Sequence, residues 1–346
     1  MRGKLVVISI LITIGILSLY LSSPAAFDKQ EQGQVETKHK LKAKNIDDII
    51  KIPADCEPVP FPGDNKVDPF WKDIAFVIRT GKNVAEERFI SGHLTWHSRV
   101  SNVIYVSDEE TEPYTYVWRG RNISMPKMWD GVNPYAPEGD ISIDSNPWYK
   151  DFVKHLGALQ ILYTQLPNMT YYIMADDDTY FFLEHLKEIL QQPQWEPRLS
   201  NVLLALCYPI DFNFPLHSCD GKFPPNSYFT AGGAGIVMSK KTMDTMFPNF
   251  PHCYEAYKTC WAGDRRLGAC LMDSGITWCN RSTFNGRDLV QTFSGKSNSH
   301  VTSLHKMSNK QFLLLDWIER MANPPGWVYD DYLMGYWEFL NNNTHW

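Results

Sequence analysis

The sequence predicts an α/β fold built on a parallel sheet with helices beside it. Three observations predict this fold: short apolar runs typical of buried strands, helical periodicity between those runs, and polar residues directly after them. The 346 residues are 44% hydrophobic and 14% aromatic, so the chain has enough apolar side chains to fill a sizeable core.

The first predicted unit is a strand, a helix and a second strand. The apolar run at residues 74–78 predicts a buried strand, which is followed by a turn at Thr80 and Gly81. A helical pattern covers residues 84–96, and residues 102–106 form a second apolar run. Elements in this order are typical of a parallel βαβ unit.

A second predicted helix leads into a strand that ends in acidic residues. Apolar spacing predicts the helix over residues 148–166, and the run at residues 171–175 predicts a buried strand. A further strand is predicted at residues 235–238 and a further helix at residues 265–272. Ligands of open parallel sheets bind beyond the carboxyl ends of strands, so Asp176 marks the expected site.

The N-terminus predicts entry into the secretory pathway. Basic residues in a short cytoplasmic tail, residues 1–4, precede an uncharged apolar stretch at residues 5–27. This stretch is long enough for a type II signal-anchor helix, although cleavage of a signal peptide near Ala25 is the alternative. Residues 28–69 have the polar composition of a stem, and residues 70–346 are the expected luminal domain.

Charge and glycosylation sequons agree with a luminal protein. The net charge of -6 and the pI of about 5.9 provide no cationic surface for phosphates, so no nucleic-acid partner is expected. Acceptor sequons for N-linked glycan are typical of surface loops in secreted proteins. They occur at Asn122, Asn168, Asn280 and Asn342.

The seven cysteines predict disulfides rather than zinc sites. They lack paired C-x-x-C motifs, and six of them lie in the second half of the chain. Cys207 with Cys219 is the favoured pair. The odd count leaves at least one thiol free or paired between chains, and Cys56 is the candidate.

Asp176, Asp177 and Asp178 form an acidic triplet at the end of the strand predicted at residues 171–175. Adjacent carboxylates repel one another, so a cation is the economical explanation. Mg²⁺ or Mn²⁺ commonly bridges protein carboxylates to substrate phosphates, and the triplet therefore predicts a diphosphate site. The alternative is a solvated acidic turn that caps a helix starting near Phe181.

The residues around the triplet resemble a known family. Residues 172–180, Tyr-Ile-Met-Ala-Asp-Asp-Asp-Thr-Tyr, are similar to the DxD segment of Fringe-like β1,3-glycosyltransferases, which include the core 1 galactosyltransferases. Further segments match in the same chain order, and the similarity extends from about residue 74 to about residue 307. These segments are residues 76–81, residues 95–108, the glycine-rich residues 228–240, and residues 263–268.

The resemblance implies a GT-A fold, which is a Rossmann-like mixed sheet flanked by helices, as a single luminal catalytic domain behind a membrane anchor. It implies inverting transfer from a UDP-sugar to a hydroxyl of a glycan or glycoprotein acceptor, with a β1,3 linkage and with Mn²⁺ or Mg²⁺ as cofactor. The expected location is the Golgi or ER membrane, with single-pass type II topology. A homodimer is left open.

The resemblance also implies roles at the metal. Asp178 is expected to bind the metal. Asp176 is a further candidate ligand, or reaches the ribose or a metal-bound water, and Asp177 is a candidate for binding the nucleotide sugar. His305 falls where the family has a metal-binding histidine, although a lone histidine is otherwise more often structural. Phosphate oxygens and water are expected to complete the coordination shell.

A base is required for inverting transfer, and Asp264 matches the position of the family's base. Its alternative role is an N-cap of the helix predicted at residues 265–272. Gly263 departs from the family by replacing an acidic residue, which leaves the orientation of the acceptor open. Gly232 and Gly233 allow the backbone to approach the sugar or diphosphate, or else form a tight turn.

The nucleotide is expected at the ends of the first two strands, where Thr80, Gly81 and Asp108 are placed to meet uridine and ribose. Arg99 is a further candidate, although a charge after a helix is usually only solvated. Four tryptophans are candidates for stacking on acceptor sugars, with core packing as the alternative. These are Trp261, Trp278, Trp317 and Trp327.

Two other functions are compatible with the sequence. A non-catalytic luminal sugar-binding or scaffolding protein would keep the fold without the chemistry. A metal-dependent hydrolase of phosphate esters would require a denser set of ligands, usually for two metals, and the sequence does not offer one.

Overall fold

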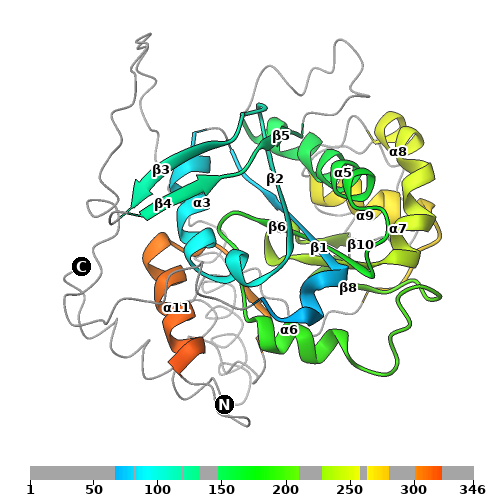
Figure 1. Ribbon diagram of the computed structural model, residues 1–346. Coiled ribbons are helices and arrows are strands. Elements are labelled where there is room, and N and C mark those ends of the chain that lie inside the picture. Colours follow the sequence, from blue (N-terminus) through cyan, green and yellow to red (C-terminus); the bar gives the residue numbers. More distant parts are fainter. Residues whose placement is uncertain are drawn as a thin grey trace, which may run out of the picture. The chain divides into compact units, whose positions relative to one another are not determined.

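A computed structural model provides the fold of this protein (Figure 1). It describes residues 67–81, 83–118, 121–131, 147–209, 228–257, 263–279 and 301–321. The predicted cytoplasmic tail, membrane anchor and nearly all of the stem, including Cys56, lie outside these residues. Within them, no helix combines the length and the apolar character that crossing a bilayer requires.

The central sheet of the described residues has the strand order β5-β2-β1-β6-β11-β8. β1 pairs in parallel with β2 and β6, and β2 pairs in parallel with β5. β11 is antiparallel to β6 and β8, so the sheet is mixed but mostly parallel. This confirms the parallel βαβ unit and the mixed sheet. The strands are β1 (Ile74–Arg79), β2 (Asn102–Ser107), β5 (Met128–Asp130), β6 (Tyr171–Asp176), β8 (Leu203–Ala205) and β11 (Ile236–Ser239).

Helices cover both faces of this sheet (Figure 1). Side chains of β1 alternate between the faces, so Phe76 and Ile78 belong to the core under α3, α6 and α11. Ala75 and Val77 belong to the core under α5, α7, α8 and α9. The helices are α3 (Ala85–Leu94), α5 (Pro147–Gln165), α6 (Leu183–Leu190), α7 (Lys240–Met246), α8 (Phe250–Ala256), α9 (Gly263–Asp273) and α11 (Asn309–Met321).

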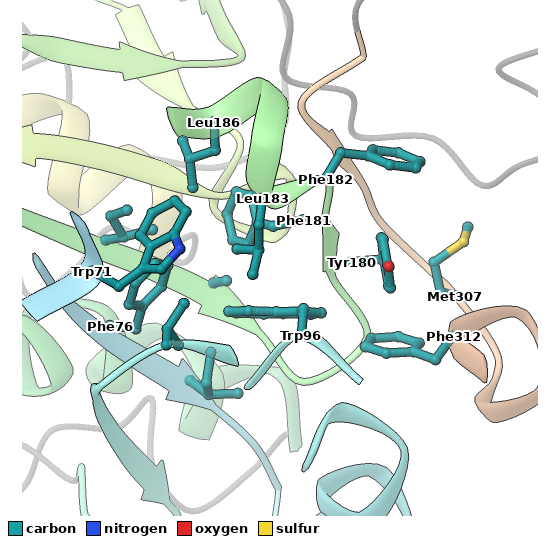
Figure 2. Packing of buried hydrophobic residues seen from close by; sticks show 14 of the residues in the cluster. Trp71, Phe76, Trp96, Tyr180, Phe181, Phe182, Leu183, Leu186, Met307 and Phe312 are labelled. Atoms are coloured by element: carbon teal, nitrogen blue, oxygen red, sulfur yellow. The ribbon is translucent and has the colours of Figure 1, made fainter. Parts of the chain in front are cut away.

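Aromatic packing fixes the segment that follows the triplet (Figure 2). Trp96 is fully buried, with ring centroids 5.6 Å from Phe76 and 5.1 Å from Phe181. Its indole N–H donates to the carbonyl oxygen of Thr179 at 3.0 Å. The chain immediately after Asp178 is therefore held by the core, which restrains where the carboxylates can lie.

Three pairs of short strands lie outside the central sheet. Their pairing corrects the helix predicted to start near residue 181, because residues 180 and 181 pair with a strand more than 120 positions later and α6 begins at Leu183. Their members are β3 (Tyr114–Trp118) with β4 (Arg121–Met125), β9 (Cys207–Pro209) with β10 (Tyr228–Thr230), and β7 (Tyr180–Phe181) with β12 (Ser303–Leu304).

The disulfides correct one predicted pairing. Cys207 is bonded to Cys279, at a sequence separation of 72 residues, and not to Cys219, which lies outside the described residues. The reason is that the segment after α9 returns alongside β9, where the two Cα atoms are 6.5 Å apart. A second disulfide joins Cys253 of α8 to Cys270 of α9.

Candidate active site

The acidic triplet lies at the carboxyl edge of the central sheet, where β1 and β6 end side by side. Arg79, the last residue of β1, is in register with Asp176, the last residue of β6. The N–H of Asp177 then donates to the carbonyl oxygen of Arg79 at 2.9 Å. The first five residues of β6 are buried, so a rigid strand presents the carboxylates.

β12 brings His305 to this edge by pairing with β7, and the N–H of Met307 donates to the carbonyl oxygen of Asp178 at 3.0 Å. His305 Nε2 lies 3.1 Å from Asp178 Oδ1 and 3.6 Å from Asp176 Oδ2. One possible ligand atom from each of Asp176, Asp178 and His305 lies within 4.8 Å of the other two. We refer to these three residues as the acidic cluster.

Asp177 has a different environment from its neighbours in the triplet. Its carboxylate is nearly buried, accepting from the hydroxyl of Thr80 at 2.5 Å and from Arg88 Nη1 at 2.6 Å. Burial raises the pKa of Asp177 to about 6, although the Arg88 and Thr80 contacts oppose that rise. Asp177 is therefore committed to contacts inside the protein, and it does not belong to the acidic cluster.

The charge of Asp178 is favoured by its two basic neighbours. Burial alone would raise its pKa, but the contacts with His305 and Arg88 outweigh burial and lower it. Arg88 Nη1 lies 3.3 Å from Asp178 Oδ2, and the Arg88 side chain is 39% exposed. Arg88 thus reaches from α3 to the rim of the acidic cluster, where a cationic group can meet a bound anion.

The glycine-rich segment turns tightly in front of the acidic cluster. A Cβ at position 233 would lie 2.2 Å from Cε1 of His305, so Gly233 leaves the space that the imidazole occupies. Gly235, which precedes β11, has φ of 89°, a backbone conformation that residues other than glycine rarely adopt. The tight turn predicted before this strand is confirmed, and the turn also makes room for side chains of the site.

Asp264 lies in the first turn of α9 and is part of the helix, so its alternative role as the N-cap is wrong. Its side chain is 31% exposed, and its Oδ1 lies 2.6 Å from Nε2 of buried His155. A Cβ at position 232 would lie 2.7 Å from the same Oδ1, so Gly232 allows the glycine-rich turn to approach Asp264. The Asp264 carboxylate therefore lies at the positive end of the helix dipole.

The residues expected at the nucleotide lie at the ends of β1 and β2. Lys154 of α5 donates to the carbonyl oxygen of Thr80 at 2.9 Å, and its Nζ lies 2.7 Å from Asp108 Oδ1. A Cβ added at Gly81 would lie 3.8 Å from Asp108 Oδ2. Thr80, Gly81 and Asp108 are thus brought together, with the hydroxyl of Thr80 engaged by Asp177.

Arg99 pairs with α11 and not with residues of the sheet edge. Arg99 Nη1 lies 2.5 Å from Glu319 Oε2 and 3.6 Å from Asp316 Oδ1. Both carboxylates are buried, and an isolated buried carboxylate is costly, which gives the guanidinium a structural task there. These contacts favour a structural role over the expected nucleotide contact.

Among the four tryptophans that are candidates for stacking on acceptor sugars, the side chain of Trp278 is described. Trp278 is 53% exposed and its ring centroid lies 6.0 Å from that of Trp195, so it is available at the surface. The side chains of Trp261, Trp317 and Trp327 lie outside what the structure describes.

Sequence reasoning missed four residues that organise the site. They come from three separate elements, and their roles arise only when those elements meet. Arg79 could have been noticed as the charged residue that ends the apolar run at residues 74–79. The other three lie within helical patterns and have no such signal. They are Arg79, Arg88, Lys154 and His155.

Comparison with known families yields one match. Residues 225–313 match DUF604, a family described as a protein of unknown function. The match includes the glycine-rich turn, Asp264 and His305, but it covers less than half of the chain. No curated protein matches the sequence.

Among solved structures, the chain is similar to core-mannan synthase A from Aspergillus fumigatus in its Mn/GDP form. The sequence identity is 12% and the TM-score is 0.33, over 62% of this chain and 75% of that chain. A likeness at this level carries no argument about activity, so the site itself must support any function.

Proposed function

We propose that this protein is an inverting glycosyltransferase of GT-A type. It transfers a sugar from a UDP-sugar to a hydroxyl group of a glycan or glycoprotein and forms a β1,3 linkage. Asp176, Asp178 and His305 hold a divalent metal at the diphosphate, and Asp264 acts as the base. The mixed sheet flanked by helices agrees with the fold that the resemblance to Fringe-like β1,3-glycosyltransferases implies.

The observation that carries this proposal is the convergence of the acidic cluster from distant parts of the chain. His305 lies more than 120 residues beyond Asp178, yet β12 pairs with β7 and brings Nε2 within 3.1 Å of the carboxylate. A solvated acidic turn would not require strand pairing that places a histidine beside its carboxylates. The glycine at position 233 also leaves the space that this imidazole fills.

The residues of the acidic cluster fit a divalent metal. Two carboxylate oxygens and one imidazole nitrogen suit Mn²⁺, and three protein ligands leave positions for phosphate oxygens and water. When bound, the metal neutralises the charge that develops on the departing diphosphate. Arg88 adds a partly exposed positive charge at the rim of the same cluster.

The chemistry assigned to the protein's own residues is proton transfer and orientation. The acceptor oxygen forms a bond to the anomeric carbon while its proton passes to the carboxylate of Asp264. The bond from that carbon to the diphosphate breaks, and the electron pair leaves with UDP. Attack opposite to the leaving group inverts the configuration, as in other inverting reactions at an anomeric carbon.

We also propose a luminal location for the domain behind a type II anchor in the Golgi or ER. The disulfides Cys207–Cys279 and Cys253–Cys270 fit an oxidising compartment. The sequon residues Asn122 and Asn168 are exposed and can accept glycan. Digestion with an N-glycanase should therefore increase the mobility of the protein expressed in animal cells.

The test of function is release of nucleotide by the full chain. Purified protein is incubated with a panel of UDP-sugars and one GDP-sugar, with Mn²⁺ or with EDTA, and free nucleotide is measured. We expect release from one UDP-sugar that requires Mn²⁺ and increases with a glycan acceptor. Linkage analysis of the product then tests the β1,3 assignment.

Asp264→Asn separates catalysis from binding. General-base catalysis contributes about 10²- to 10⁴-fold, so we expect a loss on this scale while UDP still binds. Asp73→Asn, an exposed position at the other end of β1, is the matched control and should retain activity. Wild-type turnover by Asp264→Asn would refute its role. UDP binding without any turnover by the wild-type protein would favour a non-catalytic binding protein.

A further inference from the structure

Two side chains, Arg79 and His155, connect Asp176 of the acidic cluster to Asp264. Arg79 Nη2 is hydrogen-bonded to Asp176 Oδ1, and Arg79 Nη1 lies 2.5 Å from His155 Nδ1. His155 Nε2 in turn lies 2.6 Å from Asp264 Oδ1. The two middle side chains are each only 2% exposed, whereas Asp176 is 23% and Asp264 is 31% exposed.

The chemistry of arginine fixes the protonation of His155. A guanidinium group has only donors, so Nδ1 of His155 must be the acceptor of the hydrogen bond from Arg79. The ring proton is then on Nε2, which lies 2.6 Å from Asp264 Oδ1. In this tautomer the N–H group of the imidazole lies beside one oxygen of Asp264, and we assign the role of proton acceptor to the other oxygen.

Two glycines make the space that this arrangement requires. A Cβ at position 263 would lie 2.2 Å from His155 Nδ1, and a Cβ at position 232 would lie 2.6 Å from His155 Nε2. A side chain at either position would displace the imidazole. The glycine at position 263, which departs from the resembled family, is thereby explained, because His155 fills the space beside it.

We propose that His155 is a positioning residue, held in its Nε2–H form by Arg79, that orients the carboxylate of Asp264. This inference rests on the proposed function, in which Asp264 is the base. It also assigns Gly263 the task of admitting His155. The orientation matters because a carboxylate that rotates freely presents its oxygen to the acceptor for only part of the time.

The kinetic test uses the full chain and three variants. His155→Phe keeps a buried ring but removes both contacts, and we expect kcat to fall about 100-fold, the scale of a misplaced catalytic group. The KM for the donor and the Mn²⁺ affinity should stay within about twofold. His155→Gln keeps an acceptor for Arg79 and a donor for Asp264, so it should recover most of the lost kcat.

Gly263→Ala provides an independent perturbation that deletes no functional group. Its methyl group should displace His155 and lower kcat to the level of His155→Phe. The combination of Gly263→Ala with His155→Phe should be no slower than either single variant, because both act on the same contact. A normal kcat for His155→Phe, or a His155→Gln variant as slow as His155→Phe, would overturn the proposal.

A measurement independent of turnover distinguishes failure of this inference from failure of the proposed function. Ring nitrogen NMR of ¹⁵N-histidine-labelled protein, with the His155→Gln variant used for assignment, reports which nitrogen carries the proton. We expect the Nε2–H tautomer, lost in Gly263→Ala. A proton on Nδ1 would overturn the inference in an active enzyme, and an inactive wild type with the expected tautomer would overturn only the function.

Discussion

Two groups of carboxylates near β7 differ in how their negative charge is accommodated: one is partly exposed and the other is buried against an arginine. The acidic cluster of Asp176, Asp178 and His305 is 17% to 23% exposed. α11 supplies two other carboxylates that are at most 1% exposed and that face Arg99. We refer to Arg99 with Asp316 and Glu319 as the buried charge network.

The difference lies in how fully the protein itself supplies the donors. In the buried charge network, Glu319 accepts from Arg99, from the hydroxyl of Tyr180 at 2.8 Å and from the N–H of Leu183 at 3.0 Å. Burial alone would lower the pKa of Arg99, but the carboxylates outweigh it and raise the pKa. A group satisfied in this way serves stability, whereas the accessible acidic cluster can accept a cation.

The largest effect is expected from Asp178→Asn, which removes a proposed metal ligand from the acidic cluster. We expect Mn²⁺-dependent nucleotide release to fall about 1,000-fold, equivalent to about 4 kcal/mol of transition-state stabilisation. The rise in melting temperature that Mn²⁺ gives the wild type should disappear. Thermal unfolding with and without Mn²⁺, beside turnover, measures both effects, and an unchanged response to Mn²⁺ would contradict the ligand role.

The converse change is Glu319→Ala in the buried charge network. It leaves Arg99 without its nearest carboxylate, and breaking a buried ion pair costs about 3 kcal/mol or more of stability. The turnover of the folded fraction and its Mn²⁺ affinity should be unchanged. Urea unfolding provides the measurement, and Glu110→Ala, which breaks an exposed contact with Lys127, should cause no measurable shift.

Much of the central sheet could be predicted because short apolar runs in the sequence indicate buried strands. The strands expected at residues 74–78, 102–106 and 171–175 are present as β1, β2 and β6, and the helix expected at residues 148–166 is α5. The strands that were missed have two to five residues and form only where a partner strand lies beside them. β7, for example, is a strand because β12 lies beside it.

The carboxylates of the candidate site could be predicted from the sequence, but the side chains that hold them could not. The carboxylates of Asp176 and Asp178 could be located because they follow a buried strand. Their partners could not be located in the same way. The charge of Arg79 at the end of an apolar run was a visible signal, but nothing in the sequence shows that Arg79 of β1 and His155 of α5 meet. Arg99 was expected at the nucleotide, because the sequence does not show that it pairs with two carboxylates of α11.

A smaller effect is expected from Gly233→Ala, which keeps every proposed ligand but moves one. The added methyl group would overlap the ring of His305 and push its imidazole away from Asp178. Perturbing the support of a metal ligand commonly lowers metal affinity by about 10- to 100-fold, and we expect that range for Mn²⁺.

Calorimetric titration of Mn²⁺ against Gly233→Ala measures this effect, with Gly81→Ala as control. A Cβ at position 81 meets its nearest atom at 3.6 Å, an ordinary contact, so the Mn²⁺ affinity of that variant should not change. Equal affinities for wild type and Gly233→Ala would remove His305 from the proposed ligands.

The smallest effect is expected from Thr80→Val. This variant tests whether Asp177 is a buried structural carboxylate, in contrast to the proposed metal ligands Asp176 and Asp178. Asp177 resembles the buried charge network, since it is nearly buried and bonded to Thr80 and Arg88. Removing the hydroxyl should cost about 1 kcal/mol of stability, because Arg88 still binds the carboxylate. Mn²⁺ affinity should hardly change, and a decrease as large as that of Gly233→Ala would place Asp177 at the metal.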